Sequence, residues 1–213
     1  MADTLRWGFK KEAEATALEI RRELALRAVD RLDCVSLAAL FTIPVRPFTD
    51  LVAWGAAPTA ISALTALASD VSAFTVFRGS VRAIFYNPSQ PRGRAANSLA
   101  HELSHIVLEH EPQIAVAPDG SRNWDTAQEE EATWMAATAL VPRDGAFSWI
   151  KQNGSTNGGA EHFGVSEESV PLPATAHTSS GAGVRARATS ASAAWNSGVS
   201  RPNGRSAAPV SSQ

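Results

Sequence analysis

The chain has 213 residues, 44% of them hydrophobic, and a formal net charge of −2. This is enough chain for one sizeable hydrophobic core with an appendage, and it argues against two full domains. The weak charge provides no basic field for non-specific binding to nucleic acid, so we expect no direct contact with DNA or RNA.

The cysteine content and the first thirty residues bear on the compartment. A single cysteine, Cys34, excludes an internal disulfide and fits a reducing compartment, where it would serve as a small buried apolar residue. Charged residues interrupt the N-terminal stretch, so no signal peptide is visible. No run approaches eighteen consecutive apolar residues, and we therefore expect no membrane contact.

The first third of the chain predicts helices with one extended segment. Apolar residues at three-and-four spacing indicate an amphipathic helix over residues 9–31, and a shorter helix follows at 34–41. Prolines in residues 42–48 favour extended chain at a sheet edge. The next helix, 58–69, carries no Lys or Arg, which argues against a helix-turn-helix DNA reader.

Residues 72–77 and 81–86 have the composition of strands and flank a turn that contains Gly79. They predict an antiparallel β-hairpin. An extended peptide can add to such a strand by backbone hydrogen bonds, but a hairpin that only covers the helices fits the pattern equally well.

An HExxH pattern lies within the apolar run 99–108 and carries the chemistry of the chain. Positions four apart share a helix face, so His101 and His105 direct both imidazoles to one point, with Glu102 beside them. Neutral imidazole is a normal zinc ligand, and a carboxylate next to the ion can act as a general base. The pattern predicts a metal-dependent hydrolase, with Pro112 marking where the helix must stop.

A zinc hydrolase needs a third protein ligand, and the helical run 125–141 offers three consecutive glutamates, residues 129–131. They cannot all face the metal, and acidic residues early in a helix are often simply solvated. The metzincin pattern HExxHxxGxxH is excluded, because Leu108 and Glu111 occupy its Gly and third His positions.

The order of these motifs resembles the ImmA/IrrE family of metallopeptidases over about residues 9 to 168. The likeness rests on a strand ending at Tyr86, the HExxH helix, and residues 129–142, which are similar to the family pattern ExEAN-x-FAA-x-LL-x-P. Residues 163–166 also look like its C-terminal helical segment. The resemblance implies an α+β, zincin-like helical domain with a small antiparallel sheet beside the HExxH helix.

Transferred residue by residue, the resemblance makes His101 and His105 zinc ligands and Glu102 the catalytic base. Glu129 lies three residues before Ala132, where related zinc helices place their ligand, and Glu130 is the alternative. The ion is expected to be Zn²⁺, but two imidazoles and a carboxylate also suit Mn²⁺ or Fe²⁺.

Three residues near the site depart from the family pattern. Thr133 replaces the usual Asn, Met135 the Phe, and Ser104 the Gly within HExxH. Glu129 would lie one turn before Thr133, so that a ligand and a polar group supporting it share one face. His110 is one residue later than a His common in relatives, and we do not assign it as a ligand.

The resemblance also implies a function. Members act in the bacterial cytoplasm, often in prophages or in stress responses, and cleave a helix-turn-helix repressor. We therefore expect a zinc endopeptidase whose partner is a protein substrate of that class. The alternative is a metal-stabilised sensor or partner-binding module of the same fold without turnover.

The composition changes near the C-terminus. Residues 171–213 contain no Asp, Glu or Lys, and 27 of these 43 residues are Ala, Ser, Gly or Pro. Such a segment cannot bury enough apolar surface to form a core. The sequence thus predicts a metallopeptidase domain over 1–170 and a disordered tail over 171–213.

Overall fold

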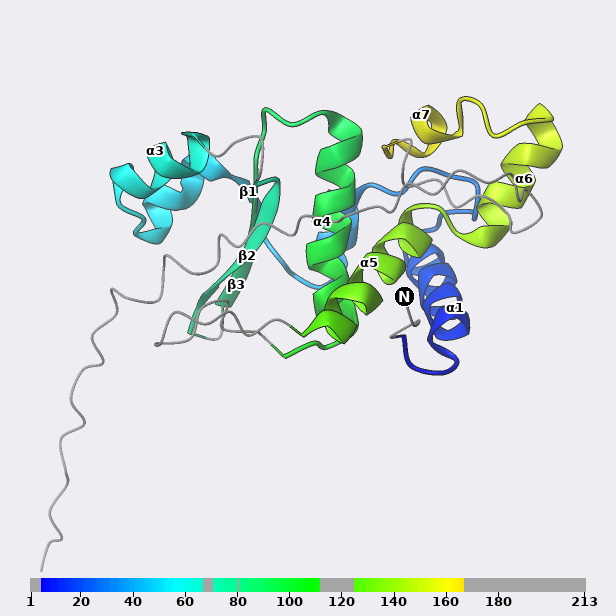
Figure 1. Ribbon diagram of the computed structural model, residues 1–213, viewed down its shortest axis with the longest axis horizontal. Coiled ribbons are helices and arrows are strands. Elements are labelled where there is room, and N and C mark those ends of the chain that lie inside the picture. Colours follow the sequence, from blue (N-terminus) through cyan, green and yellow to red (C-terminus); the bar gives the residue numbers. More distant parts are fainter. Residues whose placement is uncertain (1–4, 67–70, 80, 112–124, 167–213) are drawn as a thin grey trace, which may run out of the picture.

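A three-stranded sheet, with helices on both sides, organises the protein (Figure 1). The computed structural model describes residues 5–66, 71–79, 81–111 and 125–166. In Figure 1, helix α3 (Pro58–Ala66) lies on one side of the sheet and helix α4 (Arg92–Val107) on the other. The fold is α+β and mostly helical, as the sequence predicts.

The sheet has the order β1-β3-β2, with β1 at Val45–Pro47, β2 at Ala73–Arg78 and β3 at Val81–Tyr86. The predicted hairpin is confirmed, because β2 and β3 pair antiparallel from Ala73↔Tyr86 to Arg78↔Val81. Strand β1, which follows Pro44 and ends at Pro47, does lie at an edge, but it pairs parallel with β3, so the sheet is mixed and not purely antiparallel. A three-residue strand joined through a long crossover leaves no local pattern that would reveal its direction.

Successive side chains of β2 and β3 point to opposite faces of the sheet and so contribute to two separate apolar clusters. On one face, Phe74 and Val76 of β2 and Phe85 of β3 pack with the 3₁₀ helix η1 (Phe48–Trp54) and with α3. On the other face, Ile84 joins the main core, and Thr75 points towards α4. The period of two therefore places a polar side chain of β2 beside the HExxH helix.

Helices α1 (Phe9–Glu23) and α2 (Cys34–Leu40) supply part of the main core. The predicted helix over 9–31 ends early, because Ala25 adopts a left-handed conformation (φ 55°) and the Leu26 amide donates to the Arg21 carbonyl at 2.8 Å. This is a Schellman ending without its usual glycine, so the sequence carries no signal for it. Cys34 is buried as expected, and burial raises the pKa of its thiol to about 12.

Helix α5 (Thr126–Leu140) packs between α4 and α1. Asp125 begins it by accepting hydrogen bonds from the Ala127 and Gln128 amides at 3.0 and 3.2 Å, as an N-cap residue does. On its inner face, α5 buries Met135, Ala136, Ala139 and Leu140 in the main core. The two helices that carry the candidate site are thus held side by side.

Helices α6 (Arg143–Asn153) and α7 (Gly159–Phe163) complete the described chain. The residues after α7 return to the start of α4, where a Cβ on Gly93 would lie 2.7 Å from the Val165 carbonyl group. Asn97 Nδ2 donates to Ser166 Oγ at 2.6 Å in the same place. A residue without a side chain is therefore required at position 93 for this close approach.

Two further sequence predictions concern membrane spans and the C-terminal tail. Among the described residues, no helix is both long enough and apolar enough to cross a lipid bilayer. The predicted tail, 171–213, and the proposed domain boundary at residue 170 lie outside the described residues.

Candidate metal centre

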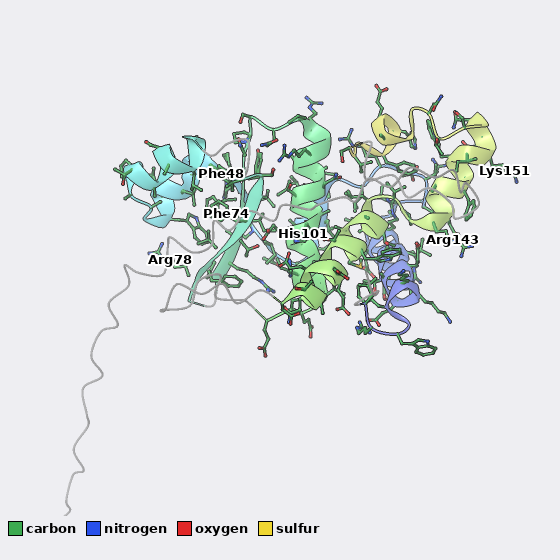
Figure 2. All side chains as sticks on the ribbon, viewed as in Figure 1. Phe48, Phe74, Arg78, His101, Arg143 and Lys151 are labelled. Carbon is green, nitrogen blue, oxygen red and sulfur yellow. The ribbon has the colours of Figure 1, made fainter. Side chains whose placement is uncertain are left out.

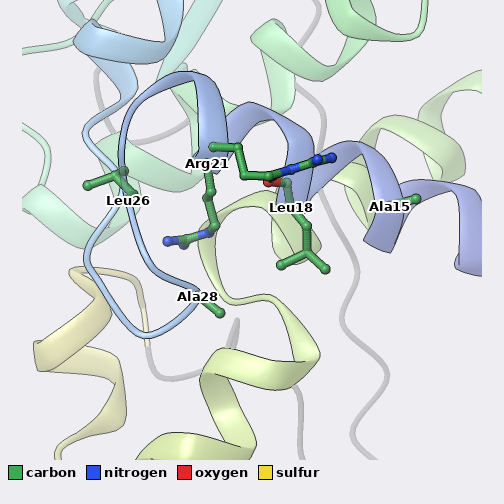
Figure 3. A pocket seen from close by; sticks show the side chains of 6 residues that line it. Ala15, Leu18, Arg21, Leu26 and Ala28 are labelled. Carbon is green, nitrogen blue, oxygen red and sulfur yellow. Dashed lines mark hydrogen bonds between the residues drawn. The ribbon is translucent and has the colours of Figure 1, made fainter.

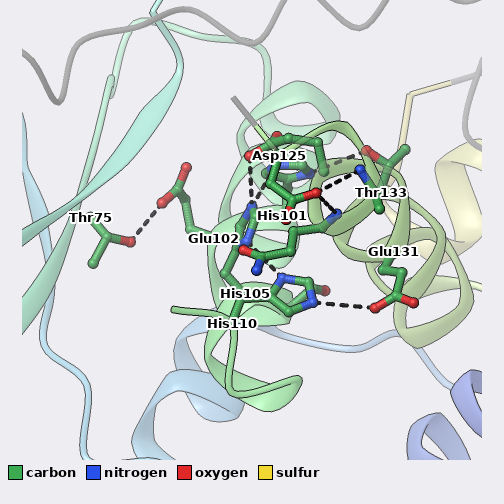
Figure 4. Close-up of polar contacts among 12 residues, drawn as sticks. Thr75, His101, Glu102, His105, His110, Asp125, Glu131 and Thr133 are labelled. Carbon is green, nitrogen blue, oxygen red and sulfur yellow. Dashed lines mark hydrogen bonds and ion pairs between the residues drawn. The ribbon is translucent and has the colours of Figure 1, made fainter. Parts of the chain in front are cut away.

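His101 and His105 project from successive turns of α4 towards α5 (Figure 4). Their Nε2 atoms lie 3.2 Å apart, with the rings nearly perpendicular at 77°. Two neutral imidazoles cannot both donate a hydrogen bond along this line, and at least one of these nitrogens presents a lone pair to the other. Such convergence of basic nitrogens is what a metal ion would satisfy.

Glu129 completes the group from the first turn of α5. Its Oε2 lies 3.2 Å from His101 Nε2, and its Oε1 lies 3.4 Å from His105 Nε2. A tetrahedral zinc site with bonds of about 2.0–2.1 Å has ligand atoms about 3.3 Å apart, so these separations fit such an ion. Among the described residues, His101, His105 and Glu129 are the group able to hold a metal.

The charges of the three side chains favour the metal-binding forms at two positions. Burial and the neighbouring His101 lower the pKa of His105 to about 4, so this imidazole is neutral at pH 7. Burial would raise the pKa of Glu129, but the hydrogen bond with His101 holds it below its usual value, so Glu129 is a carboxylate. Burial would lower the pKa of His101, but the hydrogen bond with Glu129 and the charges of Glu102 and Glu129 outweigh this effect. The pKa of His101 is therefore raised above its usual value.

Glu102 lies on the sheet side of α4, away from Glu129. Thr75 Oγ1, on strand β2, donates to its Oε2 at 2.6 Å (Figure 4). Burial raises the pKa of Glu102, which makes its carboxylate a better proton acceptor. The sequence did not single out Thr75, although alternation along the strand would have placed it on this face.

Two residues that depart from the family pattern, Thr133 and Ser104, make defined local contacts. Thr133 Oγ1 lies 3.4 Å from His101 Nδ1, one turn after Glu129, so the expected sharing of a face is found. Buried Ser104 donates its hydroxyl to the Ala100 carbonyl at 2.7 Å, which satisfies it within the helix. Glu130, the alternative ligand, is exposed and does not belong to the group.

Two further residues near His105 were missed as site residues. His110 Nδ1 lies 3.0 Å from His105 Nδ1, and His110 Nε2 lies 3.4 Å from Glu131 Oε2. Helix α4 ends at Val107, well before Pro112, and it is this early ending that turns His110 back towards the site. No glycine marks the ending, so only the structure reveals it.

A surface hollow of about 480 Å³ lies elsewhere, over α1 and the loop that follows it (Figure 3). It is lined by Ala15, Leu18, Arg21, Arg22, Leu26 and Ala28. It shares no residue with the metal-binding group, and no acidic, histidine or cysteine side chain lines it. Figure 2 shows the side chains of the whole fold, with His101 near its middle.

One comparison with known protein families agrees with this geometry. Residues 61–172, more than half of the chain, match the model of peptidase family M78, described as an IrrE N-terminal-like domain. No curated protein was found to match the chain. The family match and the His-His-Glu group together support a metallopeptidase-like function with a metal cofactor. On this match, the chain belongs to the peptidase M78 family of IrrE N-terminal-like domains.

Proposed function

We propose that the protein is a zinc-dependent endopeptidase that hydrolyses a peptide bond in a protein substrate. The observation that carries the proposal is the convergence of two imidazole Nε2 atoms and one carboxylate within 3.2–3.4 Å of one another. His101, His105 and Glu129 would hold the ion. Two nitrogens and one oxygen form the ligand set of several zinc peptidases.

The exposure of the group favours a catalytic over a structural site. The side chains of His101, His105 and Glu129 keep 24%, 25% and 24% of their surface exposed. Structural zinc sites are closed by four protein ligands, whereas catalytic sites leave a position for water or substrate. Three ligands that solvent reaches fit the second kind.

Glu102 supplies the base in this proposal. A bound zinc ion would polarise the scissile carbonyl and lower the pKa of a water molecule to about 7. Glu102 follows His101 directly on α4 and would accept a proton from that water and pass it to the leaving amine. Thr75 holds this carboxylate in place through its hydrogen bond.

Strand β2 supports a protein as the substrate. It lies at the edge of the sheet, and through Thr75 it also reaches the HExxH helix. An extended peptide can pair with such an edge through its backbone. The substrate class, a helix-turn-helix repressor in the bacterial cytoplasm, is carried over from the ImmA/IrrE resemblance, as is a role in prophage or stress control.

Glu102→Gln tests the proposal, because it removes the base and leaves the three ligands intact. We expect metal content to stay near one ion per chain and cleavage to fall by about 10²–10⁴-fold. Cleavage is measured by co-expressing the protein with a candidate helix-turn-helix repressor and identifying fragments by mass spectrometry. Glu130→Gln removes the same charge from an exposed position of α5 and serves as the matched control.

Three outcomes are informative. The peptidase is supported if Glu102→Gln loses cleavage but keeps its metal, and if Glu130→Gln keeps both. Unchanged biological activity of Glu102→Gln would favour the metal-stabilised sensor instead. Absence of bound metal from the purified wild-type protein would overturn both.

A further inference from the structure

The protonation of His105 follows from the proposed metal site. Its Nε2 faces Glu129 and His101 Nε2, so this nitrogen must keep its lone pair to bind a metal. A neutral imidazole carries one proton, which must then lie on Nδ1. That Nδ1–H needs an acceptor, because a ligating imidazole is usually held by a hydrogen bond from its other nitrogen.

His110 is placed to be this acceptor, with its Nδ1 3.0 Å from His105 Nδ1. If Nδ1 of His110 accepts, its own proton lies on Nε2, which points to Glu131 Oε2 at 3.4 Å. Each contact then has one donor and one acceptor. A single assignment of protons therefore satisfies both hydrogen bonds, from His105 through His110 to Glu131. The side chains of His110 and Glu131 are only 7% and 14% exposed, so water competes weakly for these bonds.

The backbone holds His110 in this position. Glu109 has a left-handed conformation (φ 53°), and the His110 amide donates to the His105 carbonyl at 2.9 Å. This Schellman ending of α4 turns the chain so that the imidazole of His110 lies back against that of His105. The two rings have centroids 5.1 Å apart.

Glu131 is held between His110 on one side and Arg6 on the other. It belongs to α5, and Arg6, which precedes α1, places its Nε 3.1 Å from Glu131 Oε1. Both terminal nitrogens of the Arg6 guanidinium also donate to the Glu12 carboxylate, each at 2.6 Å. Three separate segments of the chain thus converge behind His105. Figure 4 shows two of them, with His110 after α4 and Glu131 on α5.

We propose that His110 and Glu131 are positioning residues that orient His105 and fix the tautomer of its imidazole for metal binding, with Arg6 holding Glu131. The inference rests on the proposed metal site and deepens it. It assigns a role to Glu131 of α5, which is not one of the proposed metal ligands. A carboxyl group that accepts a hydrogen bond behind a ligating imidazole also raises the basicity of that ligand.

The test measures affinity for Zn²⁺ by chelator competition, and the absorption spectrum of the Co²⁺-substituted protein, at one fixed pH. His110→Leu removes both hydrogen bonds and should weaken Zn²⁺ binding by about 10–100-fold. His110→Gln can accept through its amide oxygen and donate through its nitrogen, so it should restore most of the affinity. Glu131→Gln should give an intermediate loss, because it keeps an acceptor but removes the charge.

Glu109→Gln is the matched control, since it removes an exposed charge next to His110. It should leave affinity and the Co²⁺ spectrum unchanged, whereas His110→Leu should alter the spectrum because the orientation of His105 changes. If wild-type protein binds zinc and all four variants bind it equally well, the positioning role is wrong and the metal site stands. If wild-type protein binds no zinc, the proposed function fails and this inference with it.

A folding defect in His110→Leu would not leave the question open. Urea unfolding of the metal-free variants separates such a defect from a binding defect. The contrast between His110→Gln, Glu131→Gln and Glu109→Gln then decides the role. Equal affinities among these three variants and the wild type would overturn it.

Discussion

Arg21 is a charged residue that the fold encloses almost completely, with 1% of its surface exposed. One terminal nitrogen donates to the carbonyls of Ala139 and Leu140 at the end of α5, at 3.0 and 2.9 Å. The other donates to the carbonyls of Arg27 and Asp30 at 3.1 and 2.7 Å. Burial lowers its pKa to about 10, so the side chain remains charged at neutral pH and joins the loop after α1 to the end of α5.

Replacing Arg21 should destabilise the protein strongly. In Arg21→Met, four carbonyls lose a charged donor, and we expect the free energy of unfolding to fall by about 3 kcal/mol or more. Urea denaturation measures this loss. Arg22→Met, at the exposed neighbouring position, should change stability by less than about 0.5 kcal/mol, and similar losses in the two variants would contradict the bridging role.

Helix endings are the feature shared by three elements. Each of α1, α2 and α4 is followed by a non-glycine residue in the left-handed conformation: Ala25, Thr42 and Glu109, with φ between 53° and 57°. In each case the next amide donates back to a carbonyl five residues earlier. Left-handed conformations cost L-residues about 1–2 kcal/mol, so the surrounding packing must compensate for them.

Glycine at such an ending should relieve this cost. We expect Ala25→Gly to increase the free energy of unfolding by about 0.5–1 kcal/mol. The same substitution at Ala15, exposed in the interior of α1, should decrease it by about 1 kcal/mol. Thermal or urea unfolding of both variants checks the opposite signs, and a loss in Ala25→Gly would show that the ending is not strained.

These endings also explain how far the elements could be predicted. Apolar spacing and the HExxH pattern locate α1, α4 and α5, and the relation between Glu129 and Thr133 follows from helix geometry alone. The ends of α1 and α4 were placed too late, because Ala25 and Glu109 carry no breaking signal. The contacts of His110 with Glu131, and of Glu131 with Arg6, join distant positions through packing that no local pattern encodes.

At the scale of the whole molecule, metal binding and folding should be coupled. A ligand at 100 times its dissociation constant stabilises the folded state by about 2.7 kcal/mol, which corresponds to about 5–10 °C in Tm for a chain of this size. We expect saturating Zn²⁺ to raise Tm by this amount and a chelator to reverse it. His101→Ala should abolish the increase, whereas an equal increase in that variant would place the ion elsewhere.

The dependence of α5 on α1 limits what can be separated from this protein. The family match begins at residue 61, but Phe9, Ala13, Ala17 and Ile20 of α1 belong to the same core as Met135 and Leu140 of α5. A fragment trimmed to the matched region would leave those surfaces bare to solvent and would also lose Arg6. We therefore expect that the segment matched by the family model does not fold on its own, and that expression has to start upstream of α1.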